Sequence, residues 1–363
     1  MQLIFSLILL IYLIQQILFI LVIAKIKQKR KENGQSIFIS IIIPIKNEAT
    51  NLETLLNSFE TQSYPTTLFE LILVNDSSTD KSLELIHKHK NISKLNINTL
   101  SLTSNEKGKK IAILKGAKVA KSEWIITTDA DTLRNKDFIA SSVDFLTSHK
   151  NMVLCFGNVI MSTDKSFLQN FQHIEYSVLQ AVSIASSLFG TSVLGSAANM
   201  CVKKDILLQS NLKTKYCSGD DVFLLQWIKK TYGAKSVGWN FQKESAVETY
   251  PKNTWKDFWR QRIRWVGKTT GYSDFVTILV SVIAYLTNLS LLAFPFFATK
   301  TMWILIFSKP ISDILLYSVY KYRFLNKEFK ISFLHIIFTA IIYPIYLTLL
   351  VPTSVWFAKK QPW

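Results

Sequence analysis

Residues 36–45, "SIFISIIIPI", decide the fold class of this chain. The segment is almost continuously apolar and rich in isoleucine, which favours a strand buried on both faces. Similar apolar segments follow it and alternate with stretches of helical periodicity. The further strand-like segments are 69–76, 94–102 and 123–131, and the helical ones are 48–62, 79–90 and 108–120. This alternation predicts an α/β domain with a mostly parallel sheet and helices on both of its faces.

Carboxylates follow two of these predicted strands. Asp76 comes directly after "LILVN", and Asp129 and Asp131 follow "WIITT". Ligands of open α/β sheets bind beyond the carboxyl ends of the strands. The chain has no Gly-rich dinucleotide fingerprint and no Walker loop, so a bound diphosphate would need a divalent cation on oxygen ligands. "DAD" at 129–131 offers such ligands, although a short Asp-x-Asp also arises by chance, and both interpretations stay open on the residues alone.

A second acidic pair precedes a helical pattern in "SGDDVFLLQWIKK". Asp220 and Asp221 allow two interpretations. The first is a helix N-cap whose carboxylate is favoured by the helix dipole. The second is a general base, in which one acid reaches a cleft while its neighbour caps the helix.

Residues 254–265, "TWKDFWRQRIRW", interleave arginine with tryptophan. At 100° per residue they form an amphipathic helix. One face carries Trp255, Phe258, Trp259, Ile263 and Val266. We expect that face to lie at a membrane interface, with Arg262 reaching water from it. Gln261, Arg264 and Trp265 share the opposite side and offer a planar donor for phosphate beside a ring that stacks on sugar. A plain anchor helix would explain the tryptophans but not this polar trio.

Part of the chain is expected to lie in lipid, because 49% of its 363 residues are hydrophobic. Residues 1–24 carry no charge and are followed by "KIKQKRK", which by the positive-inside rule places that end in the cytosol. Three more apolar segments are 275–297, 302–320 and 331–357. We therefore expect four spans, a cytosolic catalytic domain and both termini on the other side. Lys309, Pro310 and Asp313 interrupt 302–320, which favours a kinked span packed on its neighbours over an ion site.

Charge and cysteine content argue against a nucleic-acid-binding protein and against a cysteine metal site or disulfide framework. The net charge of +17 comes mostly from lysine and suits a surface beside anionic lipid, while no nucleic-acid-binding motif is present. Cys155, Cys201 and Cys217 have no metal-site or disulfide spacing. They are expected to be reduced thiols in the cytosol.

Six motifs in order resemble the family 2 glycosyltransferases of GT-A fold, in the membrane-embedded group that includes cellulose, hyaluronan and chitin synthases and ceramide glucosyltransferase. They are "SIIIPIKNE", "ETQSYPTTLFELILVNDSSTD", "GKKIAI", "DAD", "SGDDVFL" and "QRIRW". The resemblance covers about 40–268. It implies that Asp76 contacts the nucleobase and that Lys109 binds the nucleotide. It also implies that Asp129 lies near the ribose and metal, and that Asp131 is the ligand of Mg²⁺ or Mn²⁺.

The later motifs imply the remaining roles. Asp221 resembles the general base, and Gln261, Arg264 and Trp265 resemble the interfacial motif that holds the donor diphosphate and the acceptor end. Asn199, in "GSAANM", resembles a position on the acceptor side. Residues 167–189 are either a second interfacial helix or an ordinary amphipathic core helix.

The expected organisation has four parts: a transmembrane helix at 1–24, the cytosolic GT-A domain at 25–251, the amphipathic helix at 252–273 and three transmembrane segments at 274–363. The expected activity is inverting, metal-dependent transfer from a nucleotide diphosphate sugar, first of all a UDP-sugar, to a lipid or a growing polysaccharide at the membrane. A processive polysaccharide synthase with export is the main alternative. A non-catalytic membrane protein that binds sugar nucleotides is a further one, although every expected acid is present.

Overall fold

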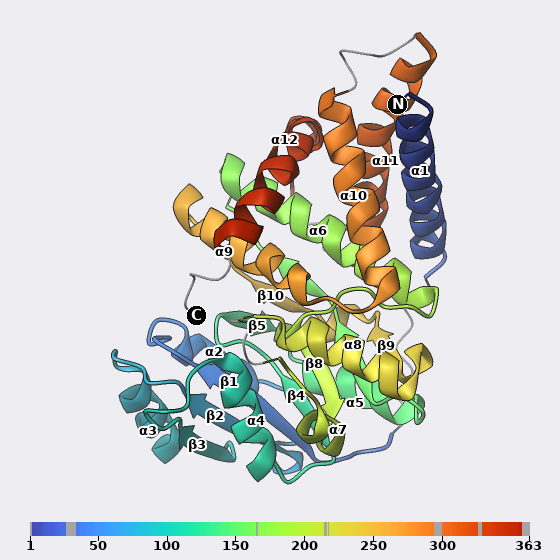
Figure 1. Ribbon diagram of the computed structural model, residues 1–363. Helices are drawn as coiled ribbons and strands as arrows, with labels where there is room; N and C mark the ends of the chain where they lie inside the picture. The colour runs from blue at the N-terminus through green and yellow to red at the C-terminus, as the bar shows by residue number, and fades with distance from the viewer. Residues whose placement is uncertain are drawn as a thin grey trace. The chain divides into compact units, whose positions relative to one another are not determined.

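The computed structural model describes residues 2–26, 34–164, 166–213, 216, 218–293, 300–325 and 329–357. The chain divides into two compact units, whose elements Figure 1 labels. The α/β unit comprises Gln28–Ile160 and Leu194–Tyr250, and the helical unit comprises Met1–Lys27, Met161–Val193 and Pro251–Pro362. The range predicted for the cytosolic domain, 25–251, includes residues 161–193, which belong to the helical unit. Most of the predicted cytosolic basic stretch, 27–31, lies outside the described residues.

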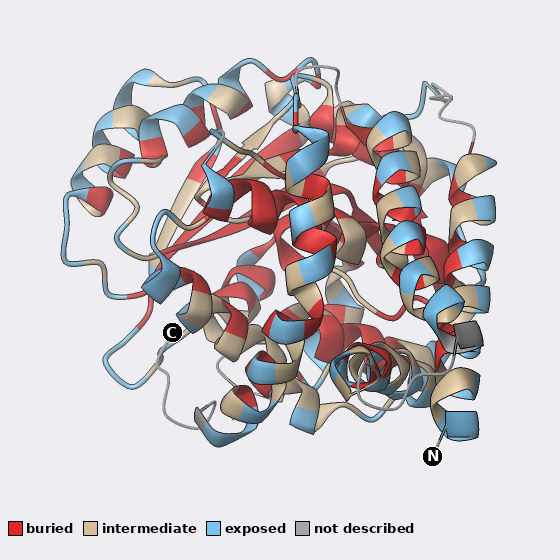
Figure 2. Ribbon diagram, turned by 90° about the horizontal axis from the view of Figure 1, so that it is seen from above, coloured by how far each residue is buried: buried red, intermediate tan, exposed pale blue. Residues whose placement is uncertain are grey.

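A seven-stranded sheet of order β3-β2-β1-β4-β8-β6-β9 forms the core of the α/β unit. The strands are β1 (Ile39–Ile45), β2 (Phe69–Asn75), β3 (Ile97–Ser101), β4 (Trp124–Thr127), β6 (Leu154–Gly157), β8 (Met200–Lys203) and β9 (Val237–Asn240). β1 runs parallel to β2 and β4, whereas β8 is antiparallel to β4 and β6. Every residue of β1 and β2 is buried, and Figure 2 shows the strands enclosed by helices. Burial on both faces explains their continuous apolar sequence.

Helices of the expected lengths connect the strands, and the predicted α/β alternation is confirmed. They are α2 (Leu52–Glu60), α3 (Ser82–Ile92), α4 (Lys109–Val119), α5 (Phe138–Ser148), α7 (Lys204–Gln209) and α8 (Asp220–Tyr232). A small second sheet contains β5 (Thr132–Arg134), β10 (Val247–Thr249) and β7 (Val159–Met161) in that order. α4 approaches β1 so closely that a Cβ on Gly116 would lie 2.7 Å from a side-chain carbon of Ile42. Glycine is therefore required at that helix position.

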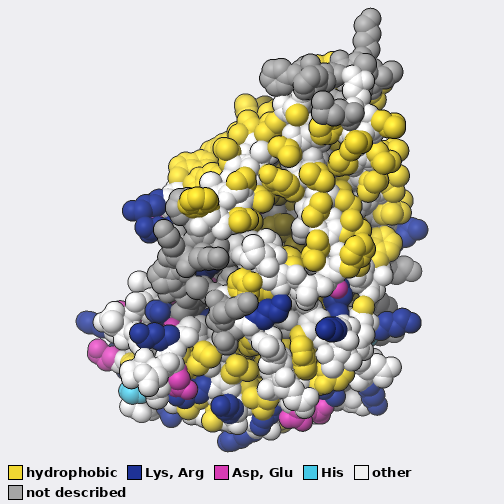
Figure 3. Space-filling view, viewed as in Figure 1, with side chains coloured by type: hydrophobic (Ala, Val, Ile, Leu, Met, Phe, Trp, Pro, Cys, Tyr) yellow, Lys and Arg dark blue, Asp and Glu magenta, His cyan; other side chains and the backbone are white. Residues whose placement is uncertain are grey.

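The helical unit contains α1 (Gln2–Ala24), α6 (Phe167–Leu188), α9 (Trp255–Gly267), α10 (Phe275–Ala293), α11 (Lys300–Phe324) and α12 (Phe333–Phe357). Among the described residues, three helices are long and apolar enough to cross a membrane: Gln2–Ala24, Phe275–Ala293 and Phe333–Trp356. Their outward side chains make the surface of this unit largely hydrophobic (Figure 3). α6 is mostly buried in the unit, which favours the core-helix interpretation of 167–189.

α11 corresponds to the predicted span 302–320 and continues as a helix through Pro310. Two of its charged side chains pair with each other and with groups on neighbouring helices. Lys309 is fully buried and pairs with Asp313 at 2.7 Å, and it donates a hydrogen bond to Asn288 of α10 at 2.8 Å. Tyr12 of α1 donates to Asp313 at 2.6 Å. Closed pairing of this kind supports the packed helix over an ion site.

Cys155 of β6 and Cys201 of β8 lie opposite each other, and both are free, buried thiols. Burial raises the pKa of Cys155 and raises that of Cys201 to about 12. Both therefore stay neutral at physiological pH. Cys217 lies outside the described residues.

Candidate active site

Asp76 lies where β2 ends, beside the end of its parallel neighbour β1. One of its carboxylate oxygens, Oδ2, accepts from the N–H of Gly108 at 3.1 Å and pairs with Lys46 at 3.4 Å. The side chain is buried, and its other oxygen, Oδ1, has no hydrogen-bond partner among the described residues. An unsatisfied buried acceptor costs about 1–3 kcal/mol. A ligand that donates a hydrogen bond there would remove that cost.

Gly108 makes the turn that begins α4. Its φ of 101° belongs to the region that favours glycine, which explains the "GKK" sequence at this turn. The turn directs one N–H to Asp76 and places Lys109 at the first helical position. The same turn therefore serves two of the predicted site residues.

Lys109 joins two acidic segments of the α/β unit. Its Nζ lies 2.5 Å from an oxygen of Asp129, after β4, and 3.6 Å from an oxygen of Asp220, at the start of α8. Burial by itself lowers the pKa of Lys109, but the carboxylates of Asp129 and Asp220 outweigh it, and the pKa is raised. The lysine therefore carries its charge at every physiological pH.

Lys110 was not among the predicted site residues, but it binds the backbone of the segment before α8. Its ammonium donates to the backbone carbonyls of Lys213 at 3.1 Å and Tyr216 at 2.9 Å, and it lies 4.9 Å from the centre of the Phe223 ring. Lys110 thus binds the chain at Lys213 and Tyr216, before α8, while Lys109 contacts Asp220 at the start of that helix. The only sequence signal was the doubled lysine itself.

Asp129 and Asp131 are half-buried in the turn between β4 and β5. The Thr132 hydroxyl closes this turn by donating to the carbonyl of Asp129 at 2.6 Å. Over the described part of the chain, no group of three or more His, Cys, Asp or Glu side chains is arranged to hold a metal ion. Mg²⁺ is commonly bound by one or two carboxylates together with substrate phosphates and water. On those terms Asp131, with Asp129 beside it, fits a cation brought in with a diphosphate.

Asp220 and Asp221 occupy the first turn of α8, where the helix dipole favours carboxylates. The capping position itself is Gly219, at φ 91°, which has no side chain to cap the helix. The N-cap interpretation of these acids is therefore wrong in detail, because the left-handed turn requires glycine at the cap. Asp221 is half-buried, and its Oδ1 accepts from the N–H of Val222 at 2.6 Å. Its role as a general base stays a prediction.

Asn199 is buried and serves the backbone. Its amide donates to the carbonyls of Asn158 at 2.9 Å and Ser245 at 2.7 Å. A Cβ on Gly157 would lie 2.4 Å from this side chain, so glycine is required there. Any acceptor-side role of Asn199 would act through the loop that it fixes.

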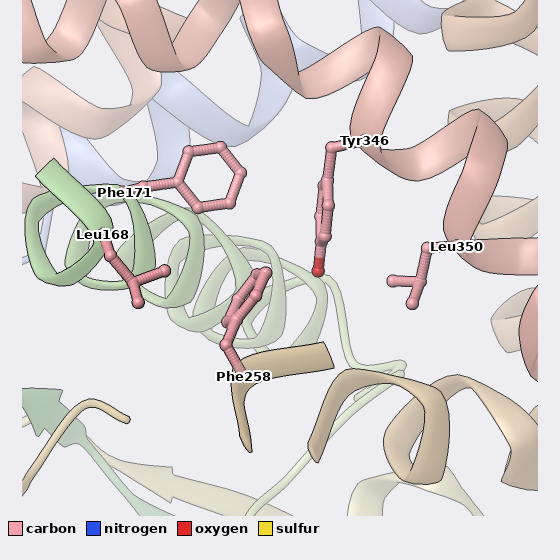
Figure 4. Packing of buried hydrophobic residues seen from close by; sticks show 5 residues of the cluster. All are labelled: Leu168, Phe171, Phe258, Tyr346 and Leu350. Atoms are coloured by element: carbon pink, nitrogen blue, oxygen red, sulfur yellow. The ribbon is translucent and has the colours of Figure 1, made fainter. Parts of the chain in front are cut away.

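α9 forms as predicted, with Thr254 as its N-cap accepting from the N–H of Asp257 at 3.1 Å. Most of its apolar face packs on protein, where lipid was expected. Phe258 is fully buried against α6 and α12 (Figure 4), and three partly buried residues of the same face pack on that cluster. The cluster consists of Leu168, Phe171, Phe258, Tyr346 and Leu350, with Trp259, Ile263 and Val266 at its edge. Trp255 remains half exposed.

Arg262 does not reach water. It is 1% exposed and forms an ion pair with Glu175 of α6 at 2.6 Å. The prediction that it extends from a lipid-facing surface is wrong, because protein covers that surface and supplies a buried carboxylate. Gln261, Arg264 and Trp265 remain partly exposed on α9, and the Trp265 ring lies 5.8 Å from that of Tyr176. The polar trio therefore keeps part of its surface exposed.

Two family models match the chain. "Glycosyl transferase family 2" matches residues 40–207, and "Glycosyl transferase family group 2" matches residues 124–358, which is more than half of the chain. The chain is a family 2 glycosyltransferase. The second match extends across α9 and the C-terminal helices, so the family 2 assignment includes the QRIRW segment and the helices that follow it.

This glycosyltransferase is similar to two curated proteins of staphylococci. It is 33% identical over 115 residues to a poly(ribitol-phosphate) β-N-acetylglucosaminyltransferase of Staphylococcus aureus, covering 32% of this chain and 20% of that protein. It is 24% identical over 243 residues to a poly-β-1,6-N-acetyl-D-glucosamine synthase of Staphylococcus epidermidis, covering 65% of this chain and 55% of the synthase. The glycosyltransferase thus spans about half or less of the length of these relatives.

A solved structure confirms the fold of the glycosyltransferase. A mannosyltransferase of Pyrobaculum calidifontis, solved with GDP-mannose and Mn²⁺, aligns with a TM-score of 0.61 at 14% identity, over 94% of this chain and 96% of that one. The predicted GT-A fold is thereby confirmed. Sequence analysis of the glycosyltransferase missed Lys110, Glu175 and Tyr346, because their importance comes from partners distant in the chain.

Proposed function

We propose that this glycosyltransferase moves a sugar, with inversion, from a nucleoside diphosphate sugar to an acceptor at the membrane. The observation that carries the proposal is the sheet edge where Lys109 joins Asp129 to Asp220 and where a buried oxygen of Asp76 lacks a donor. A nucleobase N–H would satisfy Asp76, and Lys109 would lie beside the nucleotide. A UDP-sugar is the donor that we expect first.

The chemistry assigned to the residues follows from their charges. Asp221 removes the proton of the acceptor hydroxyl, whose oxygen attacks the anomeric carbon as the bond to the diphosphate breaks. Arg264 offers a bidentate fork to the departing diphosphate, and Gln261 and Trp265 bind beside it. Asp131 and Asp129 would hold Mg²⁺ or Mn²⁺, which would supply further countercharge for the diphosphate. The solved mannosyltransferase binds Mn²⁺ with its donor, which supports this use of a cation.

A membrane acceptor is supported by the helical unit. α9 carries the polar trio and packs on α12, one of the three helices that are long and apolar enough to span. We infer that the catalytic domain is cytosolic and that the acceptor is a lipid or a growing chain. Processive polymer synthesis with export is the second candidate, favoured by the likeness to a poly-N-acetylglucosamine synthase. Product length on a gel separates the two.

The proposal is tested with purified full-length protein in lipid nanodiscs, supplied with Mn²⁺, membrane lipid extract and a panel of UDP-, GDP- and dTDP-sugars. Release of the nucleoside diphosphate is measured. We expect one donor, a UDP-sugar, to be turned over far faster than the others. No release and no binding with any donor would overturn the proposal.

The two sides of α9 predict different mutant behaviour. Arg264→Lys keeps the charge but loses the bidentate fork, so we expect about a 10²-fold loss of kcat/KM with the protein still in membranes. Trp259→Ala removes a ring that packs 5.6 Å from Tyr346, so it should lower stability and cost less activity. Sugar transfer and thermal melting of both variants check this. Equal losses of activity would show that the two sides of the helix do not have separate roles.

A further inference from the structure

A buried ion pair, together with a tyrosine hydroxyl, connects three helices of the helical unit. Arg262 of α9 donates to one oxygen of Glu175 of α6, through Nε at 2.9 Å and Nη2 at 2.6 Å. Tyr346 of α12 donates to the other oxygen at 2.6 Å. Burial by itself lowers the pKa of Arg262, but the Glu175 carboxylate outweighs it, and the pKa is raised. The guanidinium is therefore charged, and each oxygen of Glu175 accepts a hydrogen bond.

The same arginine contacts two residues of the polar trio. Its Nη1 donates to Oε1 of the adjacent Gln261, and its guanidinium lies 4.3 Å from the centre of the Trp265 ring. A guanidinium has donors only, so the carbonyl oxygen of the Gln261 amide must face it. The amide NH₂ then points away from Arg262. Gln261 therefore presents its NH₂ donors on the side away from Arg262.

Packing alone does not account for this arrangement. Replacing a buried ion pair by apolar side chains of similar volume is often neutral or stabilising. The surrounding cluster already supplies apolar contact between α6, α9 and α12. What apolar residues would not supply is the fixed orientation of the Gln261 amide and of the Trp265 ring.

We propose that Arg262, anchored by Glu175 and Tyr346, is a positioning residue that orients Gln261 and Trp265 toward the anionic diphosphate of the donor. The proposal rests on the proposed function, because it assigns Gln261 to the diphosphate and not to an acceptor hydroxyl. Arg262 itself does not touch the donor. It acts by holding the Gln261 amide with its oxygen toward Arg262 and its NH₂ toward the ligand.

A double-mutant cycle on the full chain in nanodiscs tests this coupling. Arg262→Lys keeps a charge for Glu175 but loses the contact with Gln261, so we expect about a tenfold fall in kcat/KM for the donor. Gln261→Ala should lower kcat/KM for the donor by a similar factor. If Arg262 acts through Gln261, the double variant loses only about twofold more than Gln261→Ala. If the losses of kcat/KM are additive, about a hundredfold in the double variant, Arg262 does not act through Gln261 and has a structural role only.

Two further variants control for a general effect of Arg→Lys on α9 and for misfolding. Arg260→Lys is the same change on the same helix, at an exposed arginine 3.8 Å from Asp257, and should leave kcat/KM unchanged. Tyr346→Phe removes the hydroxyl that Glu175 accepts and is the milder variant if Arg262→Lys fails to fold. We expect it to lower kcat/KM about threefold, and not additively with Gln261→Ala. An unchanged kcat/KM in Tyr346→Phe and in Arg262→Lys would overturn the proposal.

Binding of UDP, measured by isothermal titration on the same proteins, needs no turnover. We expect Arg262→Lys to weaken it by the same factor as Gln261→Ala. Normal wild-type transfer with an additive cycle would refute the coupling alone. A wild-type protein that neither binds UDP nor releases it from a UDP-sugar would refute the UDP-sugar donor, and with it this inference.

Discussion

Asp221→Asn is expected to lower kcat by about 10²–10⁴-fold, with donor affinity and thermal stability nearly unchanged. Asparagine cannot take a proton from the acceptor hydroxyl. The structure sharpens the test, because the capping residue is Gly219 and the contact from the Val222 N–H can be kept by an amide oxygen. Loss of activity would therefore not come from a lost helix cap.

The measurement is sugar transfer at saturating donor, with nucleotide binding and melting temperature recorded separately. Asp220→Asn is the neighbouring control and should be milder in kcat. Because Asp220 lies 3.6 Å from Lys109, its effect should appear in donor affinity instead. If Asp221→Asn transfers sugar at close to the wild-type rate, the base lies elsewhere.

Removal of divalent metal with EDTA is expected to abolish activity, and excess Mg²⁺ or Mn²⁺ to restore it. Asp129 and Asp131 flank the turn after β4, and their carboxylates would repel a diphosphate that arrives without a cation. Asp131→Asn should accordingly weaken donor binding and lower the rate together.

Initial rates across a titration of Mn²⁺, with donor binding measured in parallel, check this prediction. Asp205→Asn, at an exposed position in α7, is the matched control and should behave as wild type. Full turnover in metal-free buffer would refute the assignment of Asp131 as a cation ligand.

Several parts of the site were predictable because they depend on local sequence. Asp76 and Asp129 had to lie at one edge of the sheet once their strands, β2 and β4, were recognised as parallel strands of the same sheet. Lys109 was found through its motif, but its pairing with Asp129 and Asp220 was not, because those partners come from other elements. The role of Lys110 was missed for the same reason.

The sequence by itself determined the α/β class, because strands buried on both faces must be continuously apolar and such strands alternate with helices. It also determined α9 and three of the four predicted spans, whereas α11, at the fourth, forms a helix that is not among the described helices apolar enough to span a membrane. Only the tertiary structure decided what covers the apolar face of α9. A helical wheel separates apolar from polar, but it cannot distinguish lipid from protein as the apolar partner. Arg262 was assigned to water for this reason, although its partner Glu175 lies 87 positions away and is itself bound by Tyr346, 171 positions further on.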